Sequence, residues 1–154
     1  MKILIIVKSK HNDNTLKVAE AMSEVAPVTV TTLENAKLYN LKEYDIVGYG
    51  SGIYYGKHDK ELLNFIKNSD NNKSYCFAFS TSGSKSFEKN NKHIIKLLES
   101  KNKIVLDSFG CLGFDKFFLF AICGGLNKTH PDINDFDNAQ NFIMNVIQKY
   151  NQSK

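Results

Sequence analysis

Short apolar runs alternate with amphipathic segments along the whole of this 154-residue chain, and that alternation restricts the fold more than any other feature. The runs are rich in β-branched and aromatic residues and cover residues 2–7, 28–33, 44–49, 74–80 and 103–109. The first, third and fourth are apolar nearly throughout, which is typical of strands buried on both faces of a parallel sheet. The pattern therefore predicts five strands in a parallel sheet.

The segments between the runs have helical periodicity. Apolar residues recur at intervals of three and four after Thr15, whose side chain can cap a helix that begins there. Further helices are predicted over residues 58–67, 87–101 and 134–150. The crossover 34–42 is weaker and predicts only a turn or two of helix. Units of a strand and a helix, each of roughly 30 residues, predict a doubly wound α/β sandwich.

Length and hydropathy favour one domain that spans residues 1–154. The apolar run near the amino terminus is too short for the core of a signal peptide, and the longest apolar stretch elsewhere, 117–123, is far below the ~20 residues that a membrane helix needs. We expect a soluble, cytoplasmic protein without a membrane partner.

The cysteines and histidines carry no metal-ligand spacing. Cys76, Cys111 and Cys123 are odd in number and form no C-x-x-C pair, so we expect free structural thiols in a reducing compartment. The four histidines are scattered and pair with no cysteine or acidic cluster. No metal site is predicted.

The formal net charge is +4, and the lysines that produce it are spread along the chain. Such a charge favours anionic ligands. There is no helix-turn-helix signature, basic stripe or aromatic–basic repeat, and nucleic acid is not an expected partner.

In an open α/β sheet, ligands bind beyond the carboxyl ends of the strands, where the strand order reverses. Loop 1, residues 9–15, follows the first predicted strand and reads SKHNDNT. Its backbone amides and the positive end of the following helix suit an anion such as a phosphate monoester. Donor side chains and basic side chains add to this: Ser9, Asn12, Asn14 and Thr15, with Lys10 and His11. A polar turn with a good helix cap is the alternative.

Two further loops follow the third and fourth predicted strands. Residues 48–56 hold four glycines, which let a backbone approach a ligand, and Ile53, Tyr54 and Tyr55, on which a planar ring can stack. Residues 80–84, STSGS, can donate hydrogen bonds to a polar ring edge. The alternatives are a glycine-rich turn with packed tyrosines and an ordinary helix entry.

The order and spacing of these loops resemble the flavodoxin family. Residues 9–15 look like a longer form of that family's S-x-T-G-N-T motif, and residues 44–57 and 77–83 are similar to the stretches that carry its second and third loops. Residues 124–131, GGLNKTHP, followed by an acidic helix start, are also similar. The resemblance runs from Met1 to about Tyr150.

The resemblance implies a five-stranded parallel sheet in the order 2-1-3-4-5, with helices on both faces, and a noncovalently bound FMN. Its phosphate would be held by Ser9, Lys10, His11, Asn12, Asp13, Asn14 and Thr15. The isoalloxazine would be flanked by Ser51, Gly52, Ile53, Tyr54, Tyr55, Gly56, Ser80, Thr81, Ser82 and Gly83. Residues 52–54 are the candidates for its N5 side. No catalytic side chain is predicted, because the chemistry belongs to the cofactor.

The chain departs from the family pattern at two points. Asp13 stands where the family has glycine. If φ is positive there, the backbone is strained. The carboxylate would also repel the phosphate dianion unless its side chain turns to solvent or Lys10 or His11 compensates. Typical flavodoxins are strongly acidic, so the +4 charge implies that steering to the usual partners is poor or reversed.

Three functions stay open. The first is an FMN-binding electron-transfer protein that serves redox partner proteins. The second, motivated by the basic charge and by the aromatic segment 113–125, is an NAD(P)H-dependent FMN reductase of quinones or nitro compounds. The third, motivated by Asp13, is a flavin-free binding module. A redox carrier is favoured over a stand-alone oxidoreductase.

Segment 113–125 is expected to pack on the last helix, with a lid or a self-association patch as alternatives. The chain is expected to be a monomer or weak homodimer.

Overall fold

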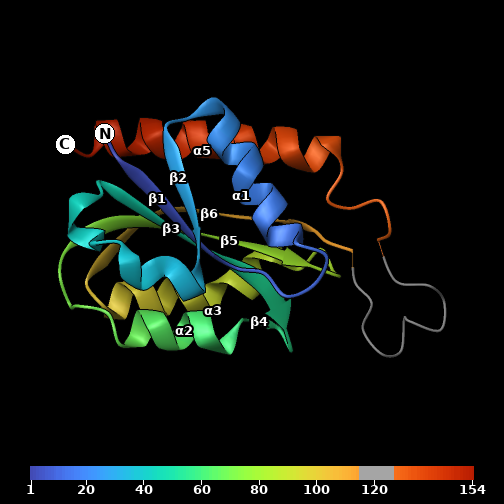
Figure 1. Ribbon diagram of the computed structural model, residues 1–154, viewed down its shortest axis with the longest axis horizontal. Coiled ribbons are helices and arrows are strands. Elements are labelled where there is room, and N and C mark those ends of the chain that lie inside the picture. Colours follow the sequence, from blue (N-terminus) through green and yellow to red (C-terminus); the bar gives the residue numbers. More distant parts are fainter. Residues whose placement is uncertain (115–126) are drawn as a thin grey trace.

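The structure of this chain is a computed structural model that describes residues 1–114 and 127–154. The strands of these residues form one sheet in the order β2-β1-β3-β5-β6, with β4 paired to β3 (Figure 1). They are β1 Ile3–Lys8, β2 Val28–Thr32, β3 Ile46–Tyr54, β4 Lys57–His58, β5 Ser74–Ser82 and β6 Lys103–Leu112. The neighbours in that order pair in parallel, and β4 pairs with β3 in antiparallel fashion. The predicted fold class and strand order are confirmed, with the short β4 as an addition.

Helices cover both faces of the sheet (Figure 1). Helices α1 Asn14–Val25 and α5 Ile133–Gln152 lie on one face. On the other lie α2 Lys60–Lys67 and α3 Phe87–Ser100. The crossover that reads weakly in the sequence forms two short 3₁₀ helices, Leu33–Leu38 and Leu41–Glu43. None of the helices in the described ranges is long and apolar enough to cross a membrane.

The unbroken apolar run of β1 follows from its place in the middle of the sheet. Ile3, Ile5 and Val7 belong to the hydrophobic core under α1 and α5, while Leu4 and Ile6 belong to the core on the other face. Successive side chains of a strand point to opposite faces, so a strand covered on both sides needs apolar residues at every position.

The third strand is longer than the sequence indicates, and two of its glycines are core positions. Gly48 and Gly50 lie opposite Phe77 and Phe79 of β5. A Cβ atom at Gly50 would lie 2.1 Å from the Phe79 ring, and one at Gly48 would lie 2.3 Å from the Phe77 ring. Assigning both glycines to a ligand-binding loop was therefore wrong, because they make room for aromatic rings inside the sheet.

Cys76 and Cys111 are buried free thiols, as expected, and burial raises the pKa of Cys76 to about 12. Cys123 lies outside the described residues. So does most of segment 113–125, and its packing on the last helix, its use as a lid and its role in self-association stay predictions.

Candidate functional site

The carboxyl ends of β1, β3 and β5 meet at one edge of the sheet, and the predicted loops lie there. Both chain termini lie at the opposite end of the molecule (Figure 1). The strand order reverses between β1 and β3, which is the position where open α/β sheets bind ligands.

Loop 1 turns through two consecutive left-handed residues, Asn12 at φ 51° and Asp13 at φ 53°. Asparagine and aspartate tolerate this conformation better than other residues with a Cβ, so the turn forms without glycine. Within the described residues, no acceptor is found for the backbone N–H groups of residues 10–13 or for those of Thr15 and Leu16 in the first turn of α1. These donors, together with the positive end of a 12-residue helix, form a site suited to an anion.

Asp13 leaves those amides available. It is the N-cap residue of α1, but its side chain accepts no hydrogen bond from the helix. The residue is exposed, in agreement with the first of the two arrangements that the sequence allows for a carboxylate at this position, the other being compensation by Lys10 or His11.

Other side chains of loop 1 fix the loop to its neighbours. The Asn14 side-chain amide donates to the Phe114 carbonyl at 2.9 Å. The Thr15 hydroxyl shares a buried hydrogen bond of 2.8 Å with the Thr81 hydroxyl at the end of β5. Asn14 and Thr15 are buried, so their hydroxyl and amide groups hold loop 1 against β5 and the segment after β6.

The second predicted loop is a hairpin. Residues 51–54 continue β3, and Tyr55 and Gly56, at φ 52° and 74°, form the turn into β4. Two positive φ values in succession are the signature of a two-residue hairpin turn. Tyr55 is 94% exposed at this turn, and the Tyr54 ring meets the His11 ring edge-on at 5.9 Å. The sequence missed β4, because Tyr-Gly is not a usual hairpin signal.

The third predicted loop is largely strand. Ser80, Thr81 and Ser82 end β5 and are buried, and their place beside a flavin ring stays a prediction. The Gly83 carbonyl accepts a hydrogen bond of 3.0 Å from the Asn127 side chain. Asn127 thereby joins this edge of the sheet, although sequence reasoning gave it no role in the site.

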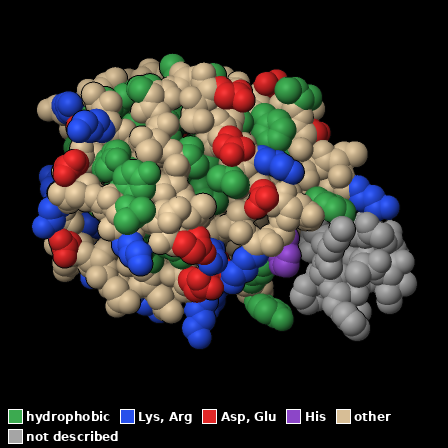
Figure 2. Space-filling model, in the orientation of Figure 1, with side chains coloured by type: hydrophobic (Ala, Val, Ile, Leu, Met, Phe, Trp, Pro, Cys, Tyr) green, Lys and Arg blue, Asp and Glu red, His purple; other side chains and the backbone are tan. Residues whose placement is uncertain are grey.

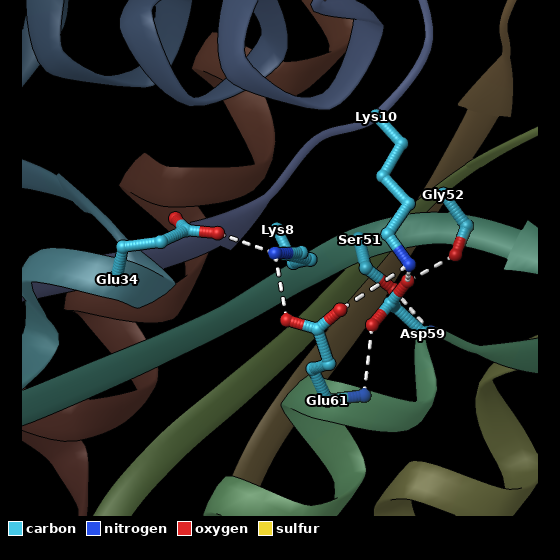
Figure 3. A network of polar contacts seen from close by, with 7 residues as sticks. All are labelled: Lys8, Lys10, Glu34, Ser51, Gly52, Asp59 and Glu61. Carbon is cyan, nitrogen blue, oxygen red and sulfur yellow. Dashed lines mark hydrogen bonds and ion pairs between the residues drawn. The ribbon is translucent and has the colours of Figure 1, made fainter.

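A network of ion pairs, which the sequence did not reveal, connects loop 1 with the hairpin (Figure 3). Lys8, at the end of β1, pairs with Glu34 and, at 2.8 Å, with Glu61. Lys10 pairs with Asp59 at 2.7 Å and approaches Glu61 at 3.5 Å. Asp59 follows β4 directly and caps α2, accepting a hydrogen bond of 2.8 Å from the Glu61 amide.

The network stabilises the charged form of its members. The hydrogen bonds that Lys8 donates to the Glu34 and Glu61 carboxylates raise the pKa of Lys8, and the one to Glu34 lowers the pKa of that carboxyl group. The hydrogen bond to Asp59 raises the pKa of Lys10. Both lysines are therefore cationic at neutral pH, and neither is a free counter-charge for a ligand.

Two histidines have defined partners. His58 of β4 is buried, and its Nε2–H donates to the Phe79 carbonyl at 3.1 Å. Burial lowers its pKa to about 4. The expectation that no histidine pairs with acidic residues was wrong for His130, because the capping box of α5 brings Asp132 and Asp135 to its ring. The Asp135 carboxylate already serves the His130 ring and the Asp132 amide.

A hollow of about 420 Å³ lies at the amino end of the strands, away from this edge. Its lining includes Asp45 and Tyr150, whose hydroxyl donates to the Asp45 carboxylate at 2.8 Å. The exposed Tyr55 and the amides that lack an acceptor in residues 1–114 and 127–154 are at the other end, and we place the candidate site there.

These features define a class: an α/β protein whose parallel sheet carries, at its strand-order switch, an aromatic hairpin and a turn whose backbone amides have no acceptor among the described residues. Within that class the chain belongs to the flavodoxin domain family, whose model matches residues 4–117.

Relatives with similar sequence or structure extend this match beyond residue 117. An uncharacterised protein of Methanocaldococcus jannaschii is 32% identical over 149 residues, covering 96% of this chain and 99% of that protein. The structure of a flavodoxin from the domain Archaea superposes with a TM-score of 0.75 at 20% identity, covering 98% of this chain and 99% of that one. A flavoprotein from Lactobacillus acidophilus, solved in complex with FMN, superposes with a TM-score of 0.58 at 14% identity, covering 71% of this chain and 92% of that one.

Proposed function

We propose that this chain binds FMN noncovalently at the carboxyl edge of its sheet and acts as an electron-transfer protein. The observation that carries the proposal is the set of backbone amides in loop 1 and the first turn of α1 that have no acceptor among the described residues. The flavodoxin family membership and the FMN complex of the Lactobacillus acidophilus neighbour support it.

The residues present fit such a cofactor. Amides of residues 10–13 and of Thr15 and Leu16 would hold the phosphate, and the exposed ring of Tyr55 offers a surface on which a flat ring stacks. When bound, FMN supplies the one- and two-electron chemistry. The chain supplies the anion site, orientation of the ring and shielding from water on the hairpin side.

Flavin titration tests the proposal. Purified protein, freed of cofactor, is added to FMN at neutral pH, and the flavin fluorescence and visible spectrum are recorded. We expect quenching and a shifted visible band with a 1:1 end point, because a ring stacked on tyrosine loses its fluorescence. If excess protein changes neither signal, the proposal is wrong.

A second measurement distinguishes the carrier from the reductase. Anaerobic addition of NADPH or NADH to the FMN complex leaves the visible band of a carrier unchanged until a separate reductase is supplied. Rapid bleaching by the nicotinamide alone would assign the chain to the reductase class.

A further inference from the structure

Lys10 is the residue of loop 1 best suited by charge to hold a phosphate, but its ammonium group lies elsewhere. Its Nζ is 2.7 Å from the Asp59 carboxylate and 3.5 Å from that of Glu61 (Figure 3). It lies 5.7 Å from the centre of the Tyr54 ring. All three partners belong to the hairpin or to the start of α2. The ammonium group therefore faces the second loop of the site.

The Asp59 carboxylate needs this partner. Its side chain is only 2% exposed, and Lys10 is the cation that contacts it within the described residues. A buried carboxylate without a counter-ion is strongly unfavourable, and breaking such a pair costs far more than breaking one at the surface. Moving Lys10 to a ligand phosphate would leave the Asp59 carboxylate with the Glu61 amide as its remaining donor among the described residues.

Asp59 in turn connects to the end of β3. Its backbone N–H donates to the Ser51 hydroxyl at 2.9 Å, and that hydroxyl donates to the Gly52 carbonyl at 2.8 Å. The Lys10–Asp59 pair thus joins loop 1 to both strands of the hairpin. A ligand that contacts loop 1 and the hairpin at once binds more tightly if the two are held in place before it arrives.

We propose that Lys10 is a positioning residue: through Asp59 it holds loop 1 and the hairpin in the arrangement that receives the flavin, and the phosphate is held by backbone amides. This inference rests on the proposed function for its ligand. Two roles of Lys10 are thereby distinguished. A side chain that contacts the phosphate changes the affinity for FMN only, whereas a positioning residue changes the affinity for any flavin.

The test compares FMN with riboflavin, which has the same ring and no phosphate. Lys10→Met should weaken binding of both by the same factor, about tenfold, because the lost preorganisation concerns the ring site. Lys10→Arg, which keeps the charge, should restore binding. Lys85→Met is the matched control: Lys85 is exposed near the end of β5 and makes no ion pair with a described residue.

Asp59→Asn tests the other partner, since asparagine still caps α2 but carries no charge. This variant should bind both flavins more weakly, as Lys10→Met does. The double variant should bind no more weakly than the single variant with the lower affinity, because the two side chains act through one contact. Hydrogen exchange without flavin gives an independent readout. The amides of residues 53–58 should exchange faster in Lys10→Met than in the parent chain.

Equal loss for both flavins with faster hairpin exchange supports the proposal. Loss for FMN alone makes Lys10 a phosphate ligand and overturns it, as does an unchanged affinity for both. If the parent chain binds neither flavin, the proposed function fails, and the exchange measurement alone decides whether Lys10 orders the hairpin.

Discussion

Asp13 combines a left-handed backbone with a negative charge at the proposed phosphate site. Its φ of 53° explains why a short polar residue stands where the family has glycine, and its exposed side chain leaves the helix amides free. The remaining cost is electrostatic, because a carboxylate near a phosphate dianion is repelled through water.

Asp13→Asn removes that charge and keeps a residue that tolerates positive φ. FMN affinity should rise about threefold to tenfold at low salt, the scale of one charge acting on a dianion across a few ångströms of water. Riboflavin affinity should not change. Fluorescence titration of both flavins at two salt concentrations checks this, and a gain for riboflavin as well would place the effect in the backbone.

His58 makes the stability depend on pH. Burial lowers its pKa from 6.5 in the unfolded chain to about 4 in the folded one, although the hydrogen bond from its Nε2–H to the Phe79 carbonyl acts in the opposite direction. The unfolded chain therefore binds the proton first as pH falls. The contribution of the neutral His58 ring to the free energy of unfolding is fully present above pH 6.5 and is lost as the pH falls from about 6.5 to 4.

Urea unfolding at pH 7 and pH 4 measures this loss, which for the His58 ring alone is at most about 3 kcal/mol. His58→Gln, which can still donate to the carbonyl, should lose less stability over that range than the parent chain. The pH dependence that remains in His58→Gln belongs to the other titratable groups of the chain. Equal pH dependence in His58→Gln and in the parent chain would contradict the assignment.

At the scale of elements, β3 connects the core with the site. Its first half lies between β1 and β5 and contains the glycines that accommodate Phe77 and Phe79, and its second half forms the hairpin. A change in the first half should therefore act on stability.

Gly50→Ala should destabilise the fold by about 1–3 kcal/mol, the usual cost of overpacking a closed core, because the new Cβ would lie 2.1 Å from the Phe79 ring. Urea denaturation measures the change. Phe79→Leu should lower the free energy of unfolding less in the Gly50→Ala variant than in the parent chain, since the smaller side chain relieves the clash. Additive effects of the two changes would show that the ring is not the obstacle.

The sequence predicted the elements that have regular periodicity and missed those made by long-range contacts. The alternation of strands and helices, the weak crossover and the turn at loop 1 follow from local patterns, and the structure contains all of them. The length of β3 and the Lys10–Asp59 pair depend on residues far apart in the chain. The hairpin is local, but its Tyr-Gly turn is not a usual hairpin signal. No spacing rule indicates that Lys10 meets Asp59, because their contact exists only after β1 and β3 have paired.

At the scale of the whole molecule, charge decides how ligands and partners approach. Basic and acidic side chains are interspersed on the face seen in Figure 2, and the ion pairs at the site bind Lys8 and Lys10 internally. The formal net charge of +4 still acts at a distance when salt is low, since the screening length then exceeds the width of the site.

The rate at which FMN associates with the cofactor-free protein should therefore fall severalfold as ionic strength rises from about 10 mM to about 150 mM, because the screening length shortens from roughly 30 Å to roughly 8 Å. Riboflavin carries no phosphate, and its association rate should stay constant over the same range. Stopped-flow fluorescence with each flavin in excess measures both rates. A rate for FMN that does not depend on salt would mean that the carboxylates at the edge cancel the field of the distant lysines. The same experiment on Asp13→Asn distinguishes a local effect of Asp13 from the field of the whole molecule. The FMN association rate of this variant should depend more steeply on salt if Asp13 is the carboxylate that opposes entry. It should depend on salt as in the parent chain if the field arises from the molecule as a whole.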